Sequence, residues 1–375
     1  MHKKIFAAGF ILLCGFVFFA SAISFNENST NIFAVDSKEA AIEEIFPFKD
    51  AVREIYGISN KLLSPNEIPK SSGYVTVKEE DGFLRTIGVA SFDIELAEQR
   101  LSELNRVCQD SGAEFVYVSY PSKNEQGDTK TYGLDSNDLE YREELLAYVD
   151  THGIHHLDVK PLFEADGYTI KDLFYKTDHH WKSTAGLYSA RAIANYLNDT
   201  LGYSLRSDLL AEDQFTVTTH EDLWFGETGR SLSLSYVNAL DDFAEIRPAY
   251  DTSIRIDYIS GDSVEGDFSI MIDDSQFAGT DVDLYDYSAH YAYDRNISSP
   301  TRYHNNTVDG PKILLIKDSF SVVVIPFLTL ATSDLTVWDI RDTPESLYDY
   351  IQQNDFDIVL LAYTDFWKTY MWDFH

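Results

Sequence analysis

The chain has 375 residues, of which 44% are hydrophobic and 24% charged, a globular composition that excludes disorder and a polytopic membrane protein. Acidic residues outnumber basic residues by 62 to 29, which gives a formal net charge of −33. Because such a field repels phosphate backbones and anionic lipid headgroups, nucleic acid is excluded as a partner, and any membrane contact has to come from an apolar segment.

The N-terminus has the pattern of an export signal. Lys3 and Lys4 precede an apolar run over residues 5–19, and the small residues at 20–22 form a cleavage signature. The apolar stretch is also close to the roughly 20 residues that cross a bilayer, so residues 1–25 fit either a cleaved signal peptide or an N-terminal membrane anchor. Under both alternatives we expect the protein to be exported, either secreted or held at the outer face of the cytoplasmic membrane.

Two regions follow this segment. Residues 26–92 are predicted to form a lead-in that contains a helix and a hairpin with its turn at Asp81-Gly82. Residues 93–375 are predicted to form one α/β domain. It begins with apolar residues that recur every three or four positions up to Cys108, which predicts a helix, and continues with an apolar strand over residues 114–119.

The α/β domain is predicted to contain a doubly wound parallel sheet. A second helix capped by Ser136 precedes a strand near residue 154, and Ser183 is predicted to cap a third helix. Further strand patterns alternate with helical ones toward the C-terminus, with strands at 312–316, 335–340 and 358–363 and helices from about 321 or 325 and over 344–352. This alternation is typical of parallel strands with helices on both faces.

The middle of the domain lacks this rhythm. Residues 198–309 are rich in Asp, Gly and Ser and contain only short alternating pieces, such as 253–259 and 268–272. We therefore predict a β-containing insertion or lid over this range.

Two short motifs hold residue types that suit acyl transfer. The first is Asp178-His179-His180-Trp181 before a predicted helix, and the second is Asp318-Ser319 after a predicted strand. A serine at a strand-to-helix junction lies beside unpaired backbone N–H groups that favour an oxyanion. It becomes a nucleophile when an imidazole takes its proton and a carboxylate orients that imidazole. On an extended approach, Asp178 and His180 point to one side and His179 to the other.

Together, the motifs Asp178-His179-His180-Trp181 and Asp318-Ser319-Phe320-Ser321 resemble the DHHW family. That family is similar to the alginate O-acetylation proteins, which are SGNH-hydrolase-like enzymes found outside the cytoplasmic membrane. The resemblance implies an SGNH-hydrolase-like fold in which Asp178, His180 and Ser319 form a catalytic triad, with the Asp-His block before the serine block, the reverse of the order in GDSL-type hydrolases. Lys317 stands where the family pattern often has glycine, which leaves the oxyanion-binding groups open.

Other residues are candidates for different roles. Trp181, Arg341 and Arg230 are candidates for substrate binding, although a tryptophan here is also expected in the core and an arginine in an ion pair. A metal site is an alternative use of the histidines, with ligands from His155, His156, Asp158, Asp178, His179 and His180. Because the chain lacks a one-turn ligand spacing and a thiolate pair, we expect neither a metal nor a cofactor.

The leading functional hypothesis is an extracytoplasmic O-acyltransferase, with acetyl as the expected group. The resemblance implies that the acceptor is an exopolysaccharide or another cell-surface glycan, and that a membrane-bound acyltransferase partner delivers the acetyl group. One alternative is a carbohydrate esterase that uses the same triad and releases the acyl group to water. A second alternative is a glycan-binding or assembly subunit that keeps the fold without catalysis.

Overall fold

The computed structural model describes residues 49–64, 66–69, 74–88, 92–124, 137–277, 284–285, 288–293, 299–343, 345–364 and 369–374. The predicted export segment at residues 1–25 and the cap predicted at Ser136 lie outside these residues. No helix in the described ranges is long and apolar enough to cross a membrane. The chain forms two compact units, a smaller one that joins residues up to 65 with 232–237 and a larger one that holds the rest.

In the described part of the smaller unit, two helices pack together, α3 (Lys49–Leu63) and α10 (Leu234–Val237). The carboxylate of Glu54 in α3 accepts hydrogen bonds from the backbone N–H groups of Leu234 and Ser235 at 3.1 and 3.0 Å. A negative charge at these N–H groups complements the positive end of α10. The short helix α10 is therefore held by a side chain from 180 residues earlier in the chain.

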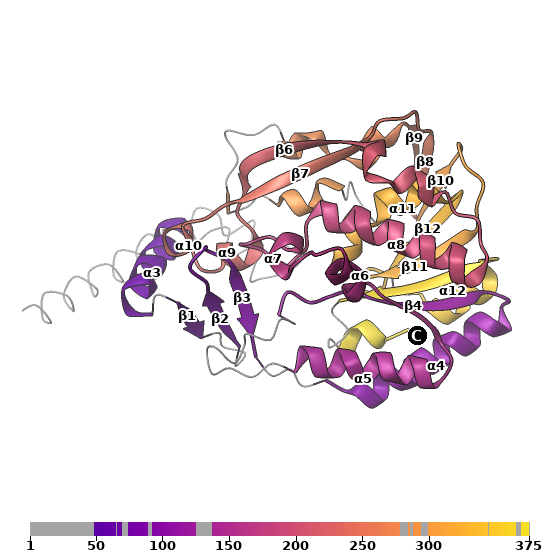
Figure 1. Ribbon diagram of the computed structural model, residues 1–375, viewed down its shortest axis with the longest axis horizontal. Coiled ribbons are helices and arrows are strands. Elements are labelled where there is room, and N and C mark those ends of the chain that lie inside the picture. The colour runs from indigo at the N-terminus through magenta and orange to yellow at the C-terminus, as the bar shows by residue number, and fades with distance from the viewer. Residues whose placement is uncertain are drawn as a thin grey trace, which may run out of the picture. The chain divides into compact units, whose positions relative to one another are not determined.

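The larger unit is built on an eight-stranded sheet (Figure 1). Its strands follow the order β5 (His155–Asp158), β4 (Glu114–Ser119), β13 (Ile358–Tyr363), β11 (Lys312–Lys317), β12 (Asp334–Asp339), β10 (Thr301–Asn305), β8 (Ile254–Asp257) and β9 (Ser263–Gly266). The first five strands are parallel, as predicted, and the last three are antiparallel. Three strands from the predicted insertion thus extend the sheet itself.

Each face of the sheet has its own hydrophobic core. In β11, Ile313 and Leu315 face one core while Leu314 and Ile316 face the other, as the two-residue period of a strand requires. A strand buried on both faces reads as the continuous apolar run seen in the sequence. One core includes α4 (Ile94–Asp110), α5 (Asp138–Thr151) and α12 (Leu347–Gln353), and the other includes α6 (Lys160–Ala165), α7 (Ile170–Leu173), α8 (Ser183–Leu201) and α11 (Ile325–Ala331).

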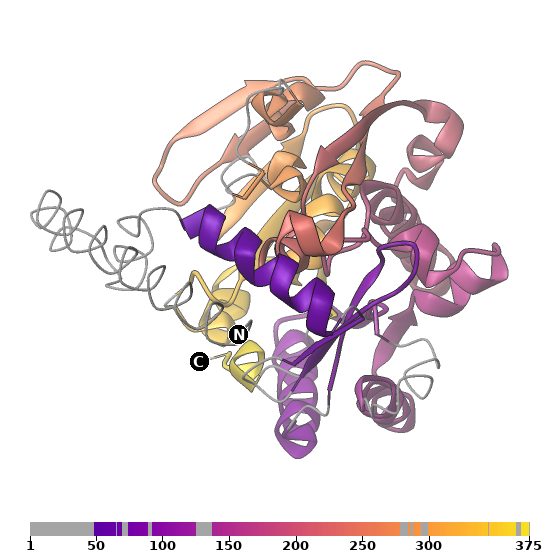
Figure 2. The same cartoon turned by 90° about the vertical axis from the view of Figure 1, so that its left-hand side faces the viewer.

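Several smaller elements surround the sheet. The predicted hairpin is present as β2 (Val75–Lys78) and β3 (Leu84–Ile87), with β1 (Glu67–Pro69) beside β2, and β6 (Phe215–Trp224) pairs with β7 (Asp241–Pro248). Figure 2 shows the orange strands of residues 241–266 on the opposite side of the larger unit from the purple helix α4. The short helices are α9 (Glu227–Arg230), η3 (Ser207–Leu210), η4 (Glu212–Gln214), η5 (Phe268–Met271), η6 (Asp274–Phe277), η7 (Ala289–Tyr293), η8 (Ser319–Val323) and η9 (Thr369–Trp372).

Three local predictions were wrong. The piece at 268–272 is the 3-10 helix η5, which Asp267 caps by accepting a hydrogen bond from the Ser269 N–H, so the local bond replaced strand pairing. Ser183 does not cap α8; its hydroxyl donates instead to the carbonyl of Ala244 in β7. Helix α12 begins at Leu347, because the Ser346 hydroxyl accepts from the Asp349 N–H and fixes the start there.

Candidate active site

Ser319 stands where the sheet's central strand β11 ends. Asp318 precedes it and caps η8, because one carboxylate oxygen accepts a hydrogen bond from the Phe320 N–H at 2.9 Å. The other carboxylate oxygen accepts from the Thr364 N–H at 2.6 Å. Thr364 directly follows β13, the neighbouring parallel strand, so this aspartate ties together the carboxyl ends of two strands. In doubly wound sheets this edge is where ligands bind. Asp318 therefore fixes the backbone from which the Ser319 side chain projects.

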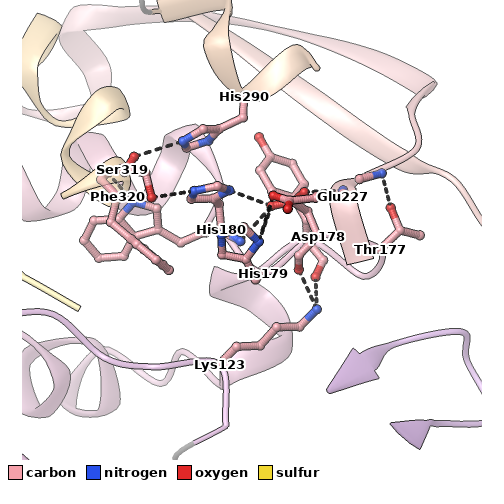
Figure 3. Close-up of polar contacts among 12 residues, drawn as sticks. Lys123, Thr177, Asp178, His179, His180, Glu227, His290, Ser319 and Phe320 are labelled. Atoms are coloured by element: carbon pink, nitrogen blue, oxygen red, sulfur yellow. Dashed lines mark hydrogen bonds and ion pairs between the residues drawn. The ribbon is translucent and has the colours of Figure 1, made fainter. Parts of the chain in front are cut away.

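The three residues of the predicted triad lie in one hydrogen-bonded line (Figure 3). The distance from His180 Nε2 to Ser319 Oγ is 2.8 Å, and that from His180 Nδ1 to Asp178 Oδ1 is 2.7 Å. Ser319 is 7% exposed and Asp178 1% exposed. The fold thus brings a hydroxyl within hydrogen-bonding distance of an imidazole that lies 139 residues earlier, with a buried carboxylate on the other ring nitrogen.

The Asp178 carboxylate is fully engaged by its surroundings. Oδ1 also accepts from the His180 backbone N–H at 2.8 Å, and Oδ2 accepts from the Glu227 N–H at 2.6 Å. Glu227 is the first residue of α9, so the carboxylate lies at the positive end of a short helix. These bonds leave the Asp178 side chain a single orientation, toward His180.

Gly226 permits the close approach of α9 to this carboxylate. A Cβ at position 226 would lie 2.3 Å from Cβ of Asp178 and 2.6 Å from its backbone nitrogen. The φ of Gly226 is −68°, which alanine adopts without strain, so the conflict is purely steric. We expect Gly226→Ala to displace Asp178 and to lower kcat for an ester substrate by about 10²-fold. Steady-state kinetics checks this. Gly202→Ala is the control for a general loss of stability, because Gly202 ends α8 with a φ of 75°, which alanine rarely adopts. Unchanged kcat in Gly226→Ala would contradict the expectation.

Charge and burial set the protonation states of the pair. Burial by itself would raise the pKa of Asp178, but the adjacent His179 and His180 and the hydrogen bonds from His180 hold that pKa well below its usual range. Burial, together with repulsion from His179 and His290, holds the pKa of His180 well below 6.5 despite the attraction of Asp178. At neutral pH the pair is therefore a carboxylate and a neutral imidazole, the state in which His180 can accept a proton.

The lowered pKa of His180 gives an expected pH dependence. If His180 is the base, activity requires its neutral form and declines as the pH falls through its pKa. Because that pKa lies below 6.5, we expect the acid limb of the profile of kcat/KM against pH to lie below pH 6.5. The rate of p-nitrophenyl acetate cleavage between pH 4 and 8 measures this limb. A half-maximal point above pH 6.5 would contradict the assigned protonation state.

His290 is a site residue that the motifs did not indicate. Its ring stacks on that of His180, with centroids 3.9 Å apart and planes 13° apart, and its Nε2 lies 3.0 Å from the carbonyl oxygen of Ser319. Because a carbonyl only accepts, Nε2 carries the proton, and burial lowers the pKa of His290 to about 4. His290 comes from a tyrosine-rich stretch without catalytic spacing, so no local signal could have identified it.

His179 does not point away from His180 as expected. Their ring centroids are 3.8 Å apart, and His179 Nδ1 lies 3.6 Å from Asp178 Oδ1 and 3.7 Å from a Glu227 carboxylate oxygen. The alternation rule failed because residues 176–180 form a bend and not an extended strand. The His179 side chain is 40% exposed, so it lies at the solvent side of the pair.

The same geometry reduces the set of residues that could bind a metal together. Within the described ranges, the group of side chains whose nitrogen and oxygen atoms are close enough to share a metal ion consists of Asp178, His179 and His180. His155 and His156 do not belong to this group. Both ring nitrogens of His180 are already hydrogen-bonded, to the carboxylate and to the serine. A metal at this position would therefore compete with the hydrogen-bonded line.

The three substrate-binding candidates have different surroundings. Trp181 is fully buried, and its Nε1 donates to the carbonyl of Phe320 at 2.8 Å, so it packs in the core against η8, the role that the sequence offered as the alternative to substrate binding. Arg341 forms a two-bond ion pair with Asp339, at 2.8 and 2.5 Å. Arg230 donates to a backbone carbonyl at 3.3 Å. A substrate role for either arginine stays a prediction.

Comparisons with known proteins give one matching family model and several similar solved structures. Residues 84–239 match the family model for the SGNH hydrolase-like domain of the acetyltransferase AlgX. Comparison with curated protein sequences gives no match. The fold is similar to that of Bacillus cereus PatB1 with a sulfonyl adduct, at 18% identity and a TM-score of 0.63, covering 80% of this chain and 97% of that one.

A DHHW family protein from Eubacterium siraeum has the same fold, at 17% identity and a TM-score of 0.57, covering 80% of this chain and 93% of that one. Likeness at these identities establishes the fold alone, and the family model covers residues 84–239, which include Asp178 and His180 but not Ser319. The resemblance predicted from the two motifs is therefore confirmed: this chain is similar to the SGNH hydrolase-like acetyltransferase family and has the fold of a DHHW family protein.

Proposed function

We propose that this protein is an extracytoplasmic O-acetyltransferase that modifies an exopolysaccharide or another cell-surface glycan through an acyl-serine intermediate. The observation that carries the proposal is the hydrogen-bonded line from Ser319 through His180 to Asp178, at the carboxyl edge of the sheet. The acetyltransferase family model over residues 84–239 supports the group transferred. The export pattern at residues 1–25 supports a glycan acceptor outside the cytoplasm.

The reaction proceeds in two balanced steps. In the first, Ser319 Oγ attacks the acetyl carbonyl of the donor while His180 Nε2 takes the hydroxyl proton and then gives it to the departing group, which leaves an acetyl-serine. In the second, His180 takes the proton of a sugar hydroxyl, whose oxygen attacks the acetyl-serine. The Ser319 oxygen then leaves with the proton from His180, so the ester bond passes to the sugar.

Asp178 supports both steps without giving up a proton. Its carboxylate accepts from His180 Nδ1, which holds Nε2 in the proton-accepting tautomer and stabilises the imidazolium formed in each step. The donor is an acetyl ester or thioester supplied by a membrane-bound acyltransferase partner, since acetyl-CoA is not expected outside the cell. No cofactor takes part in this scheme.

Incubation of the purified protein with p-nitrophenyl acetate, with and without an oligosaccharide acceptor, tests the proposal. We expect mass spectrometry to detect acetyl on Ser319 and acetylated oligosaccharide to form in preference to acetate. Release of acetate alone, unchanged by acceptors of several classes, would replace the transferase with an esterase. Absence of any acyl-enzyme, together with glycan affinity that persists in Ser319→Ala, would leave a binding subunit.

A further inference from the structure

The bend that carries Asp178 and His180 lacks the repeating hydrogen bonds of a helix or strand. Residues 175–180 are buried at most positions, so their backbone groups need partners inside the protein. Some are ordinary backbone contacts, such as the bond from the Leu84 N–H to the Lys176 carbonyl at 2.9 Å. Most of the others come from two charged side chains that lie far away in the sequence.

Lys123 supplies the carbonyl partners. It follows the end of β4, is 5% exposed, and its ammonium donates to the carbonyls of Tyr175 at 2.7 Å, Lys176 at 3.0 Å and Asp178 at 2.7 Å. An ammonium has three protons, so these bonds use its full capacity. Figure 3 shows the Lys123 side chain reaching the bend from below, with its ammonium beneath Asp178. The ammonium also lies over the ring of Phe83, 4.1 Å from the ring centroid.

Asp241 supplies the N–H partners of the same bend. It is the first residue of β7 and is 3% exposed. Its carboxylate accepts from the Lys176 N–H at 2.5 Å, the Thr177 N–H at 2.7 Å and the Thr177 hydroxyl at 2.6 Å. The Thr177 oxygen in turn accepts from the Gly226 N–H at 2.7 Å, which links the bend to the segment that contacts Asp178.

We propose that Lys123 and Asp241 are positioning residues: a pair of buried, opposite charges that holds the bend by its carbonyls and its N–H groups so that Asp178 and His180 stay aligned on Ser319. Burying two ions is costly, and packing alone is served as well by apolar side chains. In the part of the chain that the structure describes, the six hydrogen bonds of these two charged groups all go to the bend. The two charged groups therefore stabilise the backbone conformation of the bend.

The charge environment agrees with such a role. Burial lowers the pKa of Lys123 to about 7, against the attraction of Asp241 and Asp178. Burial likewise raises the pKa of Asp241, against the hydrogen bonds from Thr177 and Lys176 and the attraction of Lys123. Each charge therefore favours the ionised state of the other, together with Asp178 in the case of Lys123 and with the hydrogen bonds from Thr177 and Lys176 in the case of Asp241. Strong perturbation of this kind is common at functional sites.

The inference rests on the proposed acyl transfer. The first test of the positioning role is a kinetic comparison of variants. We expect Lys123→Met to lower kcat for p-nitrophenyl acetate by about 10²-fold, the effect of a shift of about 1 Å in a catalytic group, with KM within about twofold of the wild-type value. Lys182→Met is the matched control, because Lys182 also donates to two backbone carbonyls, those of Lys171 and Asp172, outside the bend. Its kcat should stay within about twofold of wild type. A folded Lys123→Met protein with wild-type kcat would overturn the proposal.

An NMR measurement tests the positioning role of Lys123 independently of the proposed acyl transfer. The proton between His180 Nδ1 and Asp178 should give a low-field NMR signal, identified by its loss in His180→Ala. We expect this signal to shift or disappear in Lys123→Met and to persist in Lys182→Met. If the wild-type protein hydrolyses no ester, the proposed acyl transfer is wrong, but the NMR signal still tests whether Lys123 aligns Asp178 and His180. A signal that is unchanged in Lys123→Met would refute the positioning role.

A milder pair of variants covers the case in which Lys123→Met does not fold. Thr177→Val keeps the shape of the side chain and removes the hydroxyl that joins Asp241 to Gly226, whereas Thr177→Ser keeps the hydroxyl. We expect kcat to fall about tenfold in Thr177→Val, which loses both buried hydrogen bonds of this hydroxyl, and to remain near wild type in Thr177→Ser, which keeps them. Equal activity in the two variants would overturn the proposal.

Discussion

Ser319→Ala is expected to lower kcat for an activated acetyl ester by about 10⁴-fold or more, to the residual rate that binding and oxyanion stabilisation provide in serine hydrolases. The variant loses the oxygen that lies 2.8 Å from His180 Nε2, and with it the acetyl-enzyme. The alanine also removes few packing contacts, so the melting temperature should change little. Steady-state kinetics together with mass spectrometry of the protein after exposure to the ester measures both effects.

Ser321 provides the matched control. It lies two residues further along η8, is fully buried, and its hydroxyl is 3.3 Å from that of Tyr120, away from the His180 contact. Ser321→Ala should keep its turnover and its acetylation at Ser319. A sulfonyl fluoride should label the wild-type protein and Ser321→Ala but leave Ser319→Ala unmodified. Turnover at the wild-type rate in Ser319→Ala would remove the serine from the mechanism.

Asp178→Asn is expected to lower kcat by about 10⁴-fold with the fold intact. An asparagine amide can donate to His180 Nδ1, which favours the tautomer with the proton on Nε2. That nitrogen then faces Ser319 Oγ as a donor and cannot take the hydroxyl proton. The variant also loses the negative charge that stabilises the imidazolium in each step. Kinetics with p-nitrophenyl acetate measures the loss, and circular dichroism verifies the fold.

Glu227→Gln is the control for this substitution. Glu227 holds Asp178 through its backbone N–H, which the variant keeps, while its own carboxylate is exposed and nearest to His179. We expect its kcat to stay within about threefold of wild type, since exposed charge pairs contribute little. If Asp178→Asn matched Glu227→Gln in activity, the carboxylate would not orient His180, and the hydrogen-bonded line would need another explanation.

The sequence by itself determined the elements of the parallel part of the sheet and indicated the residues that we propose as the triad. Strands such as β11 are continuous apolar runs because both faces are buried, and helices such as α4 repeat apolar residues at three and four positions. Both are local patterns that a single window of sequence contains. Asp178, His180 and Ser319 lie in two short motifs at the ends of such elements, so their chemistry could be inferred before their distances were known.

The tertiary structure alone decided what surrounds those residues. The antiparallel strands β10, β8 and β9 join the sheet, but the alternating piece that predicted β8 does not indicate that its partner is β10 or that β10 pairs with β12. His290, Lys123 and Asp241 belong to unrelated stretches and meet the motifs only after folding. A buried bend needs a partner for each polar group, but many side chains could serve, and only the packed fold selects which one does. The residue types of the proposed reaction could therefore be predicted from two local motifs. The alignment of the reacting groups depends on contacts between distant segments, which no local pattern specifies.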